Sequence, residues 1–201
     1  MQLVGYARSA TSILFDPSLR DNEVGERIFW KDLQFPTSAG KVPAANNPTW
    51  AALTTNTGEY GFGVDEFIDL ASQELPHWWK EGTAGNFHIH FSVPDANATG
   101  ASRYAQFTLY IALKDPDTNA WVETSLTAER EIPDGTLDLE SFYLDLGDTD
   151  LTGLTIGSQV KLRIKRIAAT GGTEYASDVF IHQIGCHLQA NSLGSRQEGV
   201  K

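Results

Sequence analysis

Alternation of apolar and polar residues dominates the chain from about residue 26 onward. Phe87, Ile89 and Phe91 fall on one side of an extended segment, while the intervening His88 and His90 fall on the other. This period of two is typical of a β-strand with one buried face. The same alternation runs through residues 104–113, 159–168 and 178–189. We expect each of these strands to place one face in a core and to leave the other available for contacts.

Further segments rich in β-branched and aromatic residues predict strands at 27–33, 60–70, 121–129 and 137–146. Clusters of Gly, Pro, Asp and Asn separate the segments, and such turns join antiparallel strands. Helical periodicity is confined to residues 65–72, where we expect at most one short turn. Eight or more such strands predict an all-β fold. We expect an antiparallel two-sheet β-sandwich of the jelly-roll type, with an extended N-terminal arm.

The 201 residues are expected to form one domain with extended ends. Residues 1–25 show no sustained period, and Pro17 interrupts any helix that begins near Ile13. We therefore predict an N-terminal arm over residues 1–25, a jelly-roll domain over 26–190 and a C-terminal tail over 191–201.

The acidic composition limits the partners that the protein can take. A formal net charge of −11 repels nucleic acid. No apolar run approaches the roughly 20 residues that cross a bilayer, so we expect neither a nucleic-acid nor a membrane partner. One cysteine and the absence of a secretion-signal pattern indicate a protein made and kept in a cytosol.

One basic stripe stands out against this acidity, in the segment that follows residue 159. We expect its cations to pair with carboxylates on neighbouring strands rather than to bind phosphate. The stripe consists of Lys161, Arg163, Lys165 and Arg166, and the candidate carboxylates are Glu123, Glu129, Asp138 and Glu140.

His88 and His90 are the strongest candidates for chemistry, because they project from the same strand face. A third metal ligand would come from His182 or His187, which makes the chain similar to the cupins, another group of jelly rolls. Cupins, however, carry a glutamate shortly after the second histidine, where residues 92–95 read SVPD. We interpret the pair as packed or hydrogen-bonded histidines, and we expect no metal and no cofactor.

Nucleophilic chemistry has no starting point in the chain. Cys186 shares its strand face with Ile184 and Leu188, while His187 faces the other way, so we expect a small buried side chain. A nucleophile elbow, a phosphate-binding glycine loop and a Cys-x-x-Cys pair are all absent from the sequence. We expect no enzyme activity and no catalytic residues.

Residues 76–83 (PHWWKEGT) resemble an active-site cluster in composition, but we interpret them as a seam of the sandwich. Trp78 and Trp79 are adjacent, so an extended backbone turns one inward and one outward, unless both are buried at a sheet edge. An exposed tryptophan can stack on a sugar ring or anchor a protein interface.

Four segments together resemble a family of virion proteins of tailed bacteriophages. They are residues 30–36 (WKDLQFP), 75–83 (LPHWWKEGT), 88–91 (HIHF) and the tail 192–198 (SLGSRQE). Family members commonly show Pro-His-x-x-Lys-x-Gly-Thr, then His-x-His with an aromatic residue, and end in Gly-Ser-Arg-x-Glu. The resemblance covers most of the chain from about residue 26.

This resemblance implies a jelly-roll protein of the capsid cement or decoration type. Such a protein would form a homotrimer on the capsid surface of the virion, after assembly in the host cytoplasm, and would bind and stabilise the major capsid protein shell. The residues expected to contact partners lie in the arm and in residues 76–83, and they are Ile13, Leu14, Phe15, His77, Trp78, Trp79 and Lys80.

Two other functions remain open from the sequence. The chain would instead be a tail or fibre component that binds a host glycan or protein through Trp78 or Trp79. The second alternative is a cupin-like metal-binding protein that uses His88 and His90.

Overall fold

The computed structural model describes residues 5–9, 12–15, 29–116 and 118–190. β1 (Gly5–Ser9) and β2 (Ser12–Phe15) pair as an antiparallel hairpin inside the predicted arm. The rest of the predicted arm, the boundary at residues 25 and 26, and the predicted tail 191–201 lie outside the described residues.

The described domain is built from strands of 2 to 12 residues joined by turns and loops. No helix of the described residues is long and apolar enough to cross a membrane. The elements are β3 (Phe29–Pro36), the 3-10 turn η1 (Thr37–Ala39), β4 (Thr49–Ala52), β5 (Gly58–Phe62), β6 (Phe67–Asp69), β7 (Gln73–Glu74), β8 (Gly85–Ser92), β9 (Arg103–Lys114), β10 (Val122–Ile132), β11 (Ser141–Thr149), β12 (Gln159–Ile167) and β13 (Val179–Ala190).

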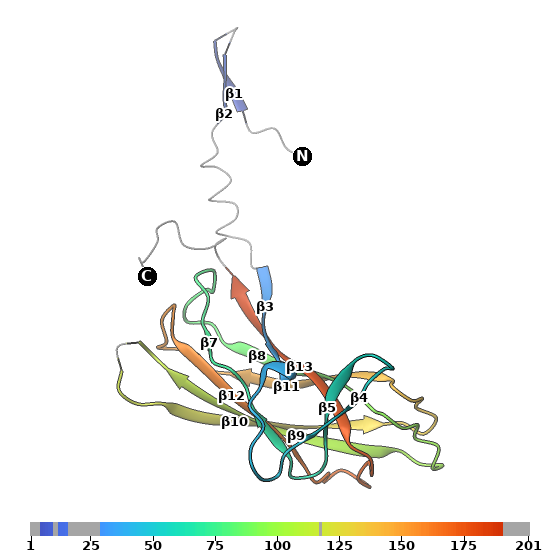
Figure 1. Cartoon of the computed structure of the whole chain (residues 1–201). Helices are drawn as coiled ribbons and strands as arrows, with labels where there is room; N and C mark the ends of the chain where they lie inside the picture. Colours follow the sequence, from blue (N-terminus) through green and yellow to red (C-terminus); the bar gives the residue numbers. More distant parts are fainter. Residues whose placement is uncertain (1–4, 10–11, 16–28, 117, 191–201) are drawn as a thin grey trace.

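These strands form two antiparallel sheets that face each other (Figure 1). The six-stranded sheet has the order β11-β8-β13-β5-β4, and β3 also pairs with β13. The five-stranded sheet has the order β10-β9-β12-β6, and β7 also pairs with β12. Leaving out β4, β5 and β7, the remaining strands are ordered β3-β13-β8-β11 and β6-β12-β9-β10, which is the double Greek key of a jelly roll. The predicted fold class is confirmed.

The core lies between the two sheets, where the apolar side of each alternating strand is buried. Phe87, Ile89 and Phe91 of β8 face inward, and the Phe91 ring lies 5.2 Å from the ring of Phe107 on β9, measured between centroids. This contact joins the two sheets. Because aromatic and branched side chains from both inner faces fill the space, the apolar surface that they remove from water is the main favourable term in folding.

Several boundaries differ from the sequence prediction. The segment predicted as one strand at 60–70 is divided between β5, in the six-stranded sheet, and β6, in the five-stranded sheet. Residues 65–72 form no helical turn, because Phe67 and Ile68 pair with β12 as β6. β11 begins at Ser141 rather than at Leu137, since Leu139 takes a positive φ of 60° that ends extended pairing. β4 and β7 were not predicted, because each is too short to show a period.

Arg166 is a buried cation that holds three parts of the domain together. Its guanidinium donates to the carbonyl oxygens of Phe62 at 2.8 Å, of Ser177 at 2.7 Å and of Tyr175, and it pairs with Glu174 at 2.6 Å. The side chain is 1% exposed. The planar fork thereby joins β12 to β5 and to the loop before β13, a geometry that a lysine cannot reproduce.

Replacing Arg166 with alanine should lower the free energy of unfolding by about 3–5 kcal/mol, because the carbonyl groups of Phe62, Ser177 and Tyr175 would lose their donor and Glu174 its ion-pair partner. Urea denaturation measures the change. The matched control is Lys165→Ala, which removes the exposed pair with Asp65 and should cost about 1 kcal/mol or less. Equal losses in the two variants would contradict the role assigned to Arg166.

Candidate functional site

The loop of residues 76–83 closes one end of the six-stranded sheet, as the sequence predicted for a seam. Trp79 is 1% exposed, and its backbone forms a bridge with Ala190 at the end of β13. The indole N–H donates to the hydroxyl of Thr83 at 3.1 Å, and the Lys80 amide donates to the Gln189 carbonyl at 2.7 Å. The Trp79 side chain therefore belongs to the core and not to the surface.

The other predicted residues of this loop remain at or near the surface. Trp78 is half-buried beneath Lys31, whose ammonium lies 5.0 Å from the ring centroid, while His77 is half-buried and Lys80 is exposed. Ile13, Leu14 and Phe15 belong to β2, and their side chains lie outside the described part of the chain. Contact of these residues with a partner stays a prediction.

Two exposed aromatic residues missed by the sequence reasoning stand beside this loop. Phe29 and Trp30 begin β3, and their backbone partners are Ala190 and Gln189 at the end of β13. Trp30 is 57% exposed. The 76–83 loop, the start of β3 and the end of β13 thus meet at one end of the sandwich, which we name the convergent end.

The outer face of the six-stranded sheet carries a cluster of histidines. His88 stacks between Tyr143 and His187, with ring centroids 5.0 and 4.3 Å away, and it meets His90 edge-on at 5.1 Å. The Nε2 of His187 lies 2.9 Å from a carboxylate oxygen of Asp32 on β3. We name Asp32, His88, His90, Tyr143 and His187 the histidine cluster.

His88 is the buried centre of this cluster. It is 1% exposed although it lies on the outer face, and its Nδ1 has no hydrogen-bond partner. The ring lies directly over Gly185, where a side chain would place a Cβ only 2.3 Å from the imidazole Nε2. Burial lowers the pKa of His88 below its ordinary value of 6.5, and the neighbouring His187 and His90 lower it further.

Only one of the two candidate third ligands joins His88. His187 stacks on it, whereas His182 lies near Ser92 and Glu59, with ring nitrogens 3.0 Å from the hydroxyl and 3.4 Å from the carboxylate. Cys186 is buried on the inner face as predicted, and burial raises the pKa of its thiol far above the ordinary range, so it stays protonated.

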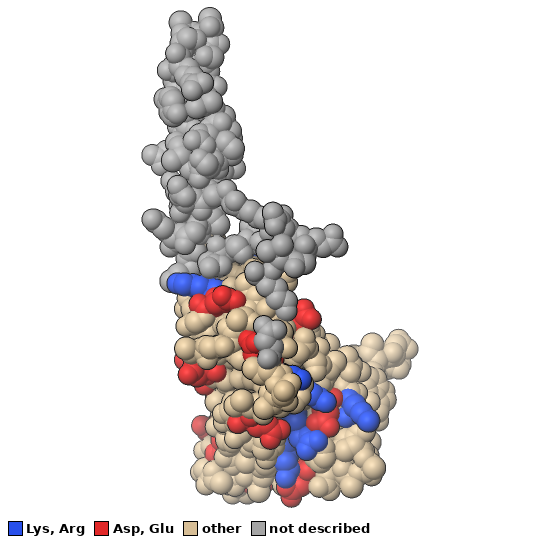
Figure 2. Space-filling model, turned by 90° about the vertical axis from the view of Figure 1, so that its left-hand side faces the viewer, with Lys and Arg blue, Asp and Glu red and all other residues tan. Residues whose placement is uncertain are grey.

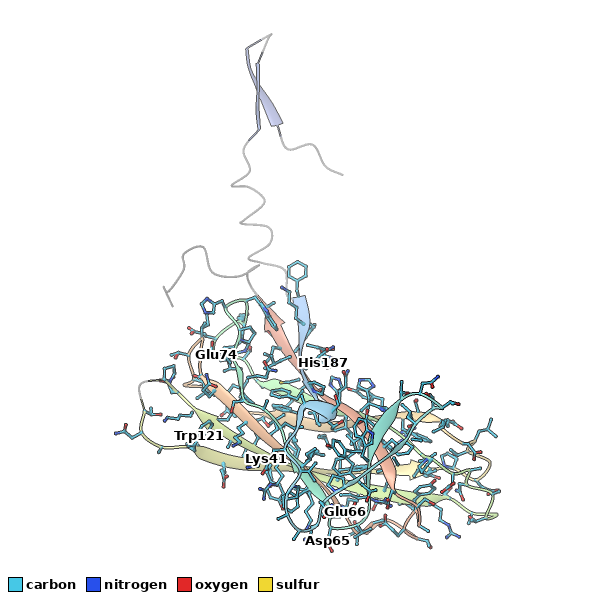
Figure 3. The ribbon with its side chains drawn as sticks, viewed as in Figure 1. Lys41, Asp65, Glu66, Glu74, Trp121 and His187 are labelled. Atoms are coloured by element: carbon cyan, nitrogen blue, oxygen red, sulfur yellow. The ribbon has the colours of Figure 1, made fainter. Side chains whose placement is uncertain are left out.

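A groove of about 790 Å³ runs along the outer face of the five-stranded sheet. Its exposed aromatic residues are Tyr110 of β9 and Trp121, which lies beside the turn between β9 and β10 (Figure 3). Arg163 and Asp69 form a bidentate pair in the same groove, at 2.6 and 2.9 Å. The guanidinium of Arg163 holds the pKa of Asp69 below its ordinary range.

Three of the four cations of the basic stripe pair with carboxylates, but not with the carboxylates that were predicted. Arg163 and Lys165 pair with Asp69 and Asp65. Arg166 is not part of the outer stripe, because it faces inward and pairs with Glu174. The expected partners were wrong because β6 rather than β10 or β11 lies beside β12 at these positions. Lys and Arg side chains are consequently interspersed with Asp and Glu on the surface seen in Figure 2.

No family model and no curated protein matches the chain. Among solved structures, a chain of the Glycosylation Associate Protein (Gap123) complex from Streptococcus agalactiae is 17% identical, with a TM-score of 0.41 over 96% of this chain. A chain of the infectious bursal disease virus Gx strain is 10% identical, with a TM-score of 0.40 over 95%. A family 35 carbohydrate binding module from Clostridium thermocellum is 10% identical, with a TM-score of 0.38 over 77%.

The likenesses are weak, and they assign neither a family nor an activity. This chain spans 32% of the streptococcal chain, 37% of the viral chain and 97% of the carbohydrate binding module. No phage family is identified by sequence. The fold itself is a jelly-roll β-sandwich, whose outer faces carry the histidine cluster on one sheet and the aromatic groove on the other.

Acid should destabilise the protein partly through His88. In the unfolded chain His88 takes up a proton at the ordinary pKa of 6.5, and in the folded chain only at a lower pH. The contribution of His88 to the free energy of unfolding is therefore fully present above pH 6.5 and is lost as the pH falls below 6.5. His88→Phe keeps a ring between Tyr143 and His187 but cannot titrate.

Urea denaturation at about pH 7.5 and about pH 5 measures this effect. The loss of unfolding free energy between the two pH values should be smaller in His88→Phe than in the unchanged protein. His77→Gln, in the 76–83 loop, controls for the removal of any histidine. An identical pH dependence in His88→Phe and the unchanged protein would contradict the assignment.

Proposed function

We propose that the chain is a structural protein of a tailed-phage particle, which trimerises and cements the capsid by binding the major capsid protein. The observation that carries the proposal is the convergent end. Phe29 and Ala190, the first and last residues of the described domain, are backbone partners there. The segments predicted to be the arm and the tail are therefore both joined to the sandwich beside the 76–83 loop.

The convergent end has the chemistry of a protein interface. Trp30 is a large, rigid side chain left more than half in water, and Phe29 is exposed beside it. Aromatic anchors of this kind dominate binding energy when a partner buries them. Lys31 over Trp78 and the exposed Lys80 add positive charge in a chain that is acidic overall. These two ammonium groups at the edge of the aromatic surface can attract carboxylates of a partner protein and so set the orientation in which the partner binds.

A second line of support is the sequence resemblance to virion proteins of tailed phages. Its most distinctive motif, residues 75–83, folds into the loop that builds the convergent end. In this proposal the chain is not an enzyme and needs no cofactor for its structural role. Each trimer would make several weak contacts with the shell, and these contacts together would stabilise the shell by avidity.

The proposal is tested by mass and by capsid binding. Light scattering should give three times the 22.0 kDa mass of the chain, and the trimer should sediment with empty capsids of the same phage. Deleting residues 1–25 should preserve the trimer and abolish sedimentation. Trp30→Ala should weaken capsid binding by about 2 kcal/mol, roughly thirtyfold, because it removes an interface anchor.

Trp50→Ala is the matched control. Trp50 is 54% exposed, but it belongs to β4, away from the convergent end. Equal effects of Trp30→Ala and Trp50→Ala, or a trimer that ignores capsids, would contradict the cement function.

The groove of the five-stranded sheet favours a second candidate function, glycan binding by a tail or fibre component. Trp121 and Tyr110 offer faces for sugar rings, and the Arg163–Asp69 pair offers hydrogen bonds to hydroxyl groups. For this candidate function we choose the groove rather than Trp78 and Trp79 as the glycan surface, since Trp79 is buried and Trp78 lies beneath Lys31.

Oligosaccharide screening by NMR decides between the two functions. A glycan-binding protein should bind one sugar class, lose it in Trp121→Ala and keep it in Trp50→Ala and after deletion of residues 1–25. Absence of binding across host-surface glycans, together with capsid sedimentation, would leave the cement function alone.

A further inference from the structure

Three potential metal ligands meet on the outer face of the six-stranded sheet, one from each of three strands. Asp32 lies opposite His187 across the β3–β13 pair, and His88 lies opposite Gly185 across the β8–β13 pair. Since Gly185 and His187 are two residues apart, their positions share a sheet face. One ligand atom of each of the three side chains lies within 4.8 Å of the other two.

The buried histidine supplies an independent indication that this group has a ligand. His88 is almost fully buried, yet its Nδ1 finds no partner in the protein. An unsatisfied buried polar atom costs free energy and is rare in native proteins. Tyr143 and His187 pack on both faces of the ring and Gly185 lies under it, so the imidazole is held in place.

We propose that Asp32, His88 and His187 bind one divalent transition-metal ion, with Zn²⁺ as the representative. Two imidazoles and one carboxylate suit zinc, iron, nickel or copper, whereas calcium and magnesium prefer oxygen ligands alone. This ligand set differs from the His88 and His90 pair of the sequence analysis, because Asp32 takes the place of His90.

Metal binding requires Asp32 and His187 to move, because the His187 ring now stacks on His88 and a ring nitrogen binds a metal in the plane of its ring. Metal–ligand bonds of about 2.0–2.2 Å place tetrahedral ligand atoms roughly 3.3 Å apart, so the three side chains must close from their present separations. Asp32 and His187 can move, because their side chains are 36% and 37% exposed, while His88 stays fixed. The existing 2.9 Å contact between Asp32 and His187 already brings one pair together.

A hollow of about 330 Å³ next to His187 gives the ion access and leaves room for a further ligand such as water. Trp30, Asn86 and Asp148 line it together with His187. The bound ion would join β3 to β8 across β13, and so fasten the strand at which the described domain begins. This inference does not depend on the proposed capsid role.

Calorimetric titration of the full chain with Zn²⁺ tests the site directly. The protein should carry no histidine tag and should be treated with a chelator that is then removed. We expect one ion per chain. Asp32→Ala and His187→Ala should each lose about a hundredfold or more in affinity, because each removes a direct ligand. Both side chains are partly exposed, so the two variants should fold, which thermal unfolding without metal verifies.

Two variants on the same face serve as matched controls. His90→Gln and His182→Gln should bind Zn²⁺ as the unchanged chain does, since neither residue belongs to the ligand set. Absence of Zn²⁺ binding by the unchanged chain would overturn the proposed site. The same conclusion would follow if Asp32→Ala and His187→Ala bound Zn²⁺ with the affinity of the unchanged chain. Loss of binding in His90→Gln but not in Asp32→Ala would replace it with the His88 and His90 pair. Capsid binding plays no part in this measurement, so either proposal can fail alone.

Discussion

The pairing of the last strand, β13, with both β3 and β8 is the constraint on which the rest of the structure depends. It closes the jelly roll by joining the first and last strands of the described domain in the same sheet. The same pairing brings Asp32, His187 and His88 onto one face and places Trp30 beside the 76–83 loop. A shift of β13 by one residue in its pairing register would turn its inner side chains to water. It would also separate the residues of the histidine cluster and move Trp30 away from the 76–83 loop.

The two outer faces of the sandwich are chemically different. On the six-stranded sheet, imidazole rings stack on one another and on Tyr143, so His88 is buried as deeply as a core residue although it lies on the outer face. On the five-stranded sheet, long charged side chains stand between exposed aromatic rings and leave a groove. The first face is suited to holding something small in a fixed geometry. The second is suited to a larger, flatter ligand.

Local alternation was enough to predict β8, β9 and β12 with their inward faces, because a period of two does not depend on the neighbouring strand. In β13 it predicted the inward face from Ile184 onward, but the register shift between Ile181 and Gln183 puts Ile181 rather than Phe180 on that face. It could not predict which strands lie side by side. Asp32 reaches the histidines only through the β3–β13 register, and Trp121 lines a groove whose other residues come from β6, β9, β10 and β12. Arg166 shows the reverse case. Its position two residues after Ile164 indicated an inward side chain, but its charge suggested the surface.

Because the two ends of the described domain are neighbours, both connections to any other protein segment leave the domain at the same place. Because Phe29 and Ala190 are antiparallel partners, their Cα atoms lie only about 5 Å apart. Residues 29–190 therefore form a cassette that fits into a surface loop of another protein with short linkers, or that tolerates circular permutation. A shell displaying this sandwich would present both junctions at a single point.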